Sequence, residues 1–249
     1  MMKDLKTLYQ DPQAVKSYWE NSTEARLAGE ERQRFVSQQL YNFIWRTTVD
    51  AFIERAELKR QPDAHLLDVG CGWGRVIVGL KQHLPTLRVV GMDLTERLLH
   101  LAEDIVPSET GMNDVRFVRG NAQYLPFADA SFDAVISTRV LQYVQDPVAA
   151  VAEFHRVLRP GGRAVVFLPN KWNPYLRLKY HTKLYSPLEV KGWFEAVGLR
   201  RVRAASIRLV PGWRRVGAHI MLPIEKALQR VPVINYTGGL VAVQGLKEV

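Results

Sequence analysis

The sequence predicts an α/β fold, an open parallel sheet covered by helices on both faces, and three observations support it. Short apolar segments alternate with helical segments from residue 64 onward. A glycine-rich turn directly follows the first of these segments, in HLLDVGCGWGRV at residues 65–76. The chain has 249 residues and is 47% hydrophobic, which suffices for one large core with an added lid.

The elements follow one another with clear boundaries. Residues 1–60 are expected to be helical, because apolar residues between Phe35 and Ile53 recur at helical spacing until Pro62 interrupts the pattern. Strands are expected at residues 65–70, 88–93, 115–122, 132–138 and 163–169. Helices are expected at residues 74–84, 95–106 and 146–158, with Thr95 and Asp146 as N-caps. The RPGG segment at residues 159–162 is expected to turn the chain before the fifth strand.

Charge is unevenly distributed along the chain. The net charge is +9, yet residues 171–249 alone hold 14 Lys/Arg and 4 Asp/Glu, a net of +10. Such a bias attracts phosphates, carboxylates, nucleic acid or an anionic membrane surface, and a solvated basic face is the simpler alternative.

Cysteine content and hydropathy restrict the class of protein. Cys71 is the single cysteine, which excludes an internal disulfide framework and a cysteine-cluster metal site, and no metal is expected. The first 13 residues lack the apolar run of a signal peptide, and no apolar run approaches the ~20 residues that cross a bilayer. We therefore expect a cytoplasmic protein, with peripheral membrane contact as an option.

The glycine loop distinguishes between two classes of nucleotide ligand. A dinucleotide-binding loop needs G-x-G-x-x-G, but the third glycine would fall on Arg75, and the pattern present is G-x-G-x-G. Asp68 precedes the loop, where a carboxylate would repel a pyrophosphate and suit an ammonium group. A capping role for Asp68 is the alternative.

The ends of the second and third strands carry further predicted ligand-binding side chains. Asp93 ends the second strand, where a carboxylate accepts hydrogen bonds from both ribose hydroxyls unless it is a solvated strand-end acid. Asn121 ends the third strand, where an amide can read an adenine edge. A nucleoside with an amino-acid tail and no phosphate fits all three places, and that ligand is S-adenosylmethionine.

At this point the sequence resembles the class I S-adenosylmethionine-dependent methyltransferases, close to their small-molecule group. The resemblance is carried over residues 64–170 by LLDVGCGWGR, VVGMDLTERLL, LPFADASFD and RVLRPGG, in the family's order and spacing. It implies a Rossmann-like, seven-stranded, mostly parallel sheet with an N-terminal helical extension and a helical insertion before the last strand. Residues 1–60 would form a lid or substrate region, and residues 61–249 the methyltransferase domain, with a substrate-side insertion at about 211–235.

The resemblance also assigns cofactor contacts, all of which follow strands. It places Asp68 at the ammonium, Asp93 at the ribose, Thr138 at the methionine part, Leu94, Asn121, Ala122 and Gln123 at adenine, and Gly70, Cys71, Gly72 and Gly74 along the methionine side and sugar. Cys71 is interpreted as a small packing residue rather than a nucleophile.

The sequence departs from the family pattern in two places. Asn121 stands where an Asp is usual, and its amide oxygen can still meet the adenine amine. Gln142 and Tyr143 replace a frequent histidine pair, which removes a candidate general base.

The acceptor side is less defined. The candidates near the acceptor are Tyr143, His181 and Tyr185, and lid candidates are Tyr18, Trp19 and Arg26. Residues 211–235 mix apolar and basic side chains, which suits a pocket for an apolar acceptor bearing an acidic group, a membrane interface, or a cover over the sheet edge.

The expected function is therefore methyl transfer from S-adenosylmethionine to a small, largely apolar or lipid-like metabolite, by O- or C-methylation. One alternative is an RNA methyltransferase that uses the basic C-terminal third, although STRVLQY at residues 137–143 lacks the Asn-Pro-Pro-Tyr type of tetrapeptide. The other is a non-catalytic cofactor-binding partner protein. The acceptor, the methylated atom and the oligomeric state are left open by the sequence.

Overall fold

The structure is a computed structural model that describes residues 48–173, 183–207 and 237–248, together with positions 13, 17, 176 and 227. A seven-stranded sheet has the order β3-β2-β1-β4-β5-β7-β6, and β7 runs antiparallel to both of its neighbours. The strands are β1 (His65–Val69), β2 (Arg88–Asp93), β3 (Arg116–Arg119), β4 (Phe132–Thr138), β5 (Leu158–Pro169), β6 (Arg200–Ile207) and β7 (Leu240–Leu246). The predicted seven-stranded, mostly parallel sheet is confirmed.

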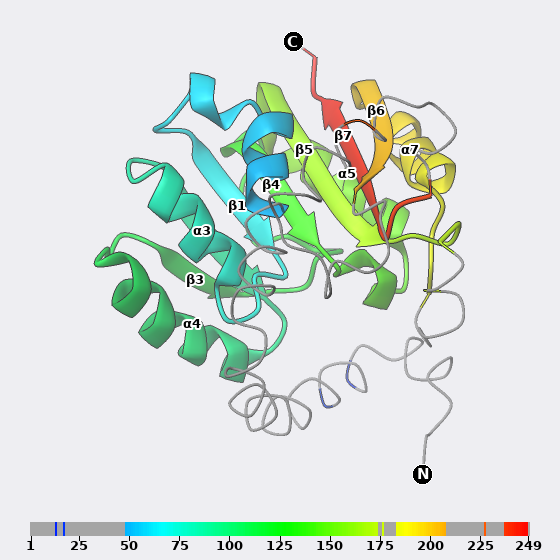
Figure 1. Ribbon diagram of the computed structural model, residues 1–249. Coiled ribbons are helices and arrows are strands. Elements are labelled where there is room, and N and C mark those ends of the chain that lie inside the picture. Colours follow the sequence, from blue (N-terminus) through cyan, green and yellow to red (C-terminus); the bar gives the residue numbers. More distant parts are fainter. Residues whose placement is uncertain are drawn as a thin grey trace.

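Helices cover both faces of this sheet (Figure 1). One face packs against a helical segment at residues 48–55, α3 (Arg75–His83) and α4 (Glu96–Thr110), and there Phe52 stacks on Phe167 with ring centroids 4.2 Å apart. The other face packs against α5 (Pro147–Val157) and α7 (Pro187–Ala196) through Phe154 and Phe194. Two short 3-10 helices are η1 (Leu58–Arg60) and η2 (Leu141–Tyr143).

Most of the predicted lid and all but one position of the predicted insertion lie outside the described residues. This applies to Tyr18, Trp19 and Arg26, to His181, and to residues 211–235 except position 227. These expectations stay predictions.

The helix starts follow local capping chemistry. Asp146 accepts the backbone N–H groups of Val148 and Ala149 at the start of α5, as predicted. Thr95 occupies the N-cap position of α4, but its side chain makes no capping hydrogen bond. The Thr95 N–H instead donates to the Asp93 carboxylate at 2.9 Å, which ties the start of α4 to the end of β2.

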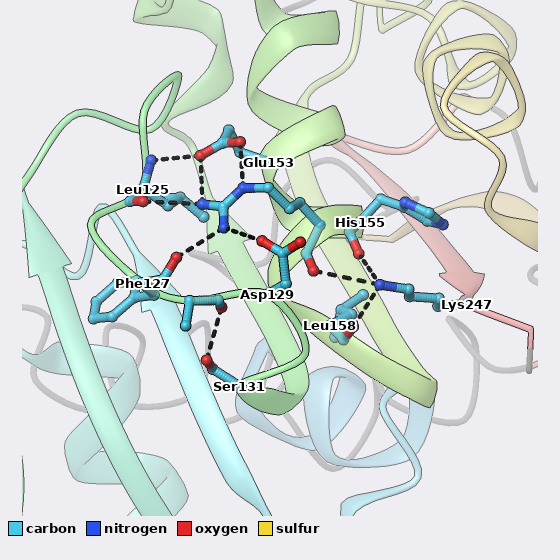
Figure 2. A network of polar contacts seen from close by, with 10 residues as sticks. Leu125, Phe127, Asp129, Ser131, Glu153, His155, Leu158 and Lys247 are labelled. Atoms are coloured by element: carbon cyan, nitrogen blue, oxygen red, sulfur yellow. Dashed lines mark hydrogen bonds and ion pairs between the residues drawn. The ribbon is translucent and has the colours of Figure 1, made fainter.

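The predicted RPGG turn is wrong, because β5 already begins at Leu158 and runs through this segment. Gly161 has a φ of +82°, and its N–H donates to the Lys247 carbonyl at 2.7 Å, while the Lys247 N–H donates to Gly162. The Lys247 ammonium also reaches the last carbonyls of α5 (Figure 2). A partner far along the chain thus keeps the glycine pair in the sheet.

Partly exposed ion pairs and hydrogen bonds fix the connection between β3 and β4 (Figure 2). The Arg156 guanidinium donates to the carbonyls of Leu125 and Phe127 at 3.0 and 2.8 Å and pairs with Asp129 and Glu153. Glu153 also accepts the Leu125 N–H at 2.7 Å. Helix α5 therefore holds both ends of this stretch of loop.

Glu153→Gln is expected to lower the free energy of unfolding by about 1–3 kcal/mol at neutral pH, because it weakens charge-assisted hydrogen bonds. The Arg156 hydrogen bond holds the pKa of Glu153 below its ordinary value of 4.5. This stabilisation is present above about pH 4.5 and is lost as the pH falls through the lowered folded-state pKa, so the difference from wild type shrinks in acid.

Urea denaturation of both proteins at neutral pH and near pH 4 measures this difference. Glu195→Gln, in an exposed pair with Lys191, is the matched control and is expected to change stability by less than ~0.5 kcal/mol. A penalty of equal size at both pH values would contradict the assignment to charge.

Candidate functional site

The carboxyl ends of β1, β2, β3 and β4 bring the predicted site residues to one edge of the sheet. The order of neighbouring strands sets their positions along this edge. The loop after β3 comes first, Asp93 at the end of β2 is next, and the glycine loop after β1 follows. Thr138, the last residue of β4, and η2, which follows β4, lie on the far side of β1.

The three glycines of the loop have different tasks, although each has positive φ. A Cβ on Gly70 would lie 2.0 Å from Val140, and one on Gly74 would lie 2.4 Å from Val106, so both are needed for packing. A Cβ on Gly72, at φ +56°, would meet no atom of the described residues within 4 Å, apart from its chain neighbours. The middle of the loop is therefore the part that leaves room for a ligand to approach the backbone.

Asp93 anchors the glycine loop. Its carboxylate accepts the N–H groups of Gly72 and Thr95, each at 2.9 Å, and the residue is partly buried. Burial raises its pKa, and the hydrogen bonds from Thr95 and Gly72 oppose that rise. Each carboxylate oxygen has a second acceptor position, so Asp93 can also accept hydroxyl groups from a ligand.

Asp68 is buried without a partner. Its side chain lies on β1, the residue is 1% exposed, and neither carboxyl oxygen has a hydrogen-bond partner among the described residues. Burial, assisted by the nearby Asp93, raises its pKa to about 8. Asp68 thus caps neither the loop nor α3, and its environment suits a ligand that brings a cation.

Two further side chains share this property. The Thr138 hydroxyl and both amide atoms of Gln142 are buried and lack hydrogen-bond partners in the described part of the chain. Every unpartnered buried side-chain oxygen or nitrogen found there belongs to Asp68, Thr138 or Gln142. Because native folds satisfy most buried polar groups, their gathering at one edge indicates a polar ligand site.

The remaining residues that were predicted to contact the cofactor lie in the loops that follow the strands. Cys71 is buried, and burial followed by Asp93 and Asp68 raises the pKa of its thiol, so it is a packing residue rather than a nucleophile. The Asn121 side-chain oxygen accepts the Gln123 N–H at 3.0 Å and shapes the turn after β3. Ala122 is buried there, while Leu94 is partly buried after β2.

Two of the three acceptor-side candidates are described. Tyr143 ends η2 and is partly buried. Tyr185 pairs with Asn170 beyond β5, and its ring lies edge-on to Trp193 at 4.6 Å. Burial, followed by Glu189, raises the pKa of Tyr185 to about 12, so its phenol can donate a hydrogen bond at neutral pH but does not act as a base.

Sequence reasoning assigned no ligand-binding role to Gln142, which it treated only as the loss of a histidine, and it missed Val140 as the residue that requires Gly70. A polar residue after β4 was the available signal for Gln142. Within the described ranges, no helix has the length and apolar character to span a membrane. The same ranges contain no group of three or more His, Cys, Asp or Glu side chains arranged to hold a metal ion.

Comparison with known proteins agrees with this geometry. The family model described as a methyltransferase domain matches residues 67–166. A ubiquinone/menaquinone biosynthesis C-methyltransferase of Ectopseudomonas mendocina is 32% identical over 197 residues, which cover 75% of this chain and 74% of the relative. An uncharacterised methyltransferase of Schizosaccharomyces pombe is 37% identical over 123 residues, or 47% of this chain and 44% of the relative.

Coverage of the relatives varies. The chain spans about half the length of several curated relatives that it matches, 44% in the Schizosaccharomyces protein. Among solved structures, a methyltransferase from Thermotoga maritima, named as S-adenosylmethionine-dependent, superimposes with a TM-score of 0.59 at 19% identity. It covers 86% of this chain and 97% of its own, and this likeness supports the fold.

Binding of S-adenosylhomocysteine is expected to release up to about one proton at pH 7. Asp68 is mostly protonated in the free protein because its pKa is about 8, and an adjacent ammonium lowers that pKa. Since the ionised carboxyl binds better, affinity is expected to rise between about pH 6 and pH 8. Calorimetry in buffers of different ionisation enthalpy counts the protons. Asp68→Asn is expected to abolish the release, and an unchanged release in that variant would assign the proton to another group.

Gly72→Ala is expected to weaken S-adenosylhomocysteine binding more than it weakens the fold. The added methyl meets no protein atom, and the left-handed backbone costs about 1–2 kcal/mol. Gly70→Ala is the matched variant, and its methyl collides with Val140, so a larger loss of stability is expected, partly relieved by Val140→Ala. Calorimetry and thermal denaturation separate the two effects. Unchanged affinity in Gly72→Ala would show that no ligand approaches the middle of the loop.

Proposed function

The chain belongs to the class I S-adenosylmethionine-dependent methyltransferases, and on that premise we propose that it methylates a small, largely apolar acceptor. The single observation that carries the cofactor assignment is the unpartnered, buried carboxyl of Asp68 on β1, the strand that leads into the glycine loop. The Ectopseudomonas relative is named for quinone biosynthesis, and it supports a quinol precursor as the acceptor to test first.

Different residues at this edge of the sheet would bind different parts of the cofactor. Asp68 would hold the ammonium, Asp93 the ribose hydroxyls, and Thr138 the methionine part. The adenine ring would lie against Leu94, Asn121, Ala122 and Gln123. When bound, S-adenosylmethionine supplies a methyl group already activated on a sulfonium. The task of the protein is therefore to align the acceptor in front of that group and to exclude water.

Neither Gln142 nor Tyr185, on the expected acceptor side, can act as a strong base. The Gln142 amide does not titrate, and the phenol of Tyr185 stays protonated at neutral pH. We therefore favour an acceptor whose reacting atom is already nucleophilic, such as an electron-rich ring carbon of a quinol. C-methylation follows from this choice more readily than methylation of an aliphatic hydroxyl.

The alternative functions depend on segments outside the described residues. Much of the basic C-terminal region lies there, including the proposed membrane-contacting segment 211–235 except position 227. The same holds for the acceptor candidate His181 and for the lid residues Tyr18, Trp19 and Arg26. Peripheral membrane contact, RNA methylation and a non-catalytic role stay predictions.

Purified protein is expected to transfer the labelled methyl group of S-adenosylmethionine to 1,4-naphthohydroquinone, the parent ring of a quinol. It is not expected to label tRNA at low salt. Asp93→Ala is the control, expected to bind S-adenosylhomocysteine at least about tenfold more weakly because two ribose hydrogen bonds are lost. Label in RNA alone would favour the RNA alternative. Cofactor binding without transfer to quinol, phenol or lipid acceptors would contradict the proposed activity.

A further inference from the structure

Gln142 is a buried residue whose polar atoms are left unused by the fold. It is 0% exposed, and neither its amide nitrogen nor its amide oxygen has a hydrogen-bond partner within the described structure. An amide in this state lowers the stability of the folded chain, because water would satisfy both atoms after unfolding. The burial therefore calls for a ligand that offers a hydrogen-bond acceptor to the amide nitrogen, and a hydroxyl would satisfy the amide oxygen as well.

The position of Gln142 separates it from the adenosine side of the site. It lies in η2, directly after β4, and η2 packs against α5 and β5. Asp93 and Asn121 follow β2 and β3, on the other side of β1. Along the sheet edge, Gln142 thus lies beyond the methionine end of the cofactor site, where an acceptor must approach the methyl group.

The chemistry of the neighbouring strand restricts what Gln142 can bind. The unpartnered carboxyl of Asp68 lies on β1, which pairs with β4 through Asp68 and Ile136. In the proposed function that carboxyl is paired with the cofactor ammonium, which leaves Thr138 and Gln142 as the unpartnered buried polar side chains on the β4 side of the described structure. A neutral amide with one donor group and one acceptor atom matches a hydroxyl or a carbonyl oxygen.

We propose that the Gln142 amide binds the hydroxyl or carbonyl oxygen of a neutral acceptor and thereby orients the acceptor in front of the methyl group. Gln142 is then a positioning and specificity residue that moves no proton. This inference rests on the proposed function and adds to it the residue that recognises the polar group of the acceptor.

Gln142→Met tests the assignment, because methionine keeps the volume of the side chain and removes the amide. The matched control is Gln82→Met on α3, where the glutamine is exposed. Four quantities are measured for wild type and both variants: the melting temperature of the free protein, the affinity for S-adenosylhomocysteine, and KM and kcat with 1,4-naphthohydroquinone.

The expected result for Gln142→Met is a melting temperature equal to or above that of wild type, cofactor affinity within about twofold, and KM raised tenfold or more. Thermal shift by 1,4-naphthohydroquinone in the presence of S-adenosylhomocysteine is expected for wild type and for Gln82→Met but not for Gln142→Met. This last readout requires binding alone and no turnover.

Four outcomes would overturn the assignment. A lower melting temperature would show that the fold already uses the amide, and a tenfold loss of cofactor affinity would place it on the cofactor. An unchanged KM with an active wild type would remove Gln142 from acceptor recognition while leaving the proposed function intact. Absence of transfer and of thermal shift in wild type, across quinol, phenol and lipid probes, would overturn both together.

Discussion

The structure depends on one constraint: three polar side chains are buried at the carboxyl edge of the sheet without partners in the described structure. Asp68, Thr138 and Gln142 each lower the stability of the ligand-free chain, and the two apolar layers on either side of the sheet must offset that cost. Two loops between the strands are held by polar groups of their own. Asp93 ties down the glycine loop, and Arg156 ties down the loop between β3 and β4.

Much of this architecture was predictable because its causes are local. Alternating apolar segments specify a parallel sheet, and a glycine loop followed by an acid 23 residues beyond Gly70 specifies a nucleoside site without phosphate. The features that sequence reasoning missed have distant causes. RPGG stays in β5 because of Lys247, and the difference between Gly70 and Gly72 is set by Val140. Gln142 could be noticed in the sequence, but its lack of a partner depends on everything packed around it.

Strand β1 separates two halves of the site that are held by different contacts. On the β2 and β3 side, Asp93 and Asn121 make backbone hydrogen bonds that shape their own loops before any ligand arrives. On the β4 side, the side chains of Thr138 and Gln142 make no such hydrogen bonds within the described residues. Under the proposed function, changes at Thr138 and Gln142 would alter the acceptor side while the loops after β2 and β3 keep their geometry.

Cys71 gives the protein a natural probe of its own motion. It is the single cysteine of the chain, it lies buried in the glycine loop, and burial keeps its thiol protonated at neutral pH. Alkylating reagents reach such a thiol only when the loop opens, so the rate of modification reports the frequency of opening. The unmodified sequence is thus already a single-site sensor, in which a ligand held against the loop slows labelling and its departure restores it.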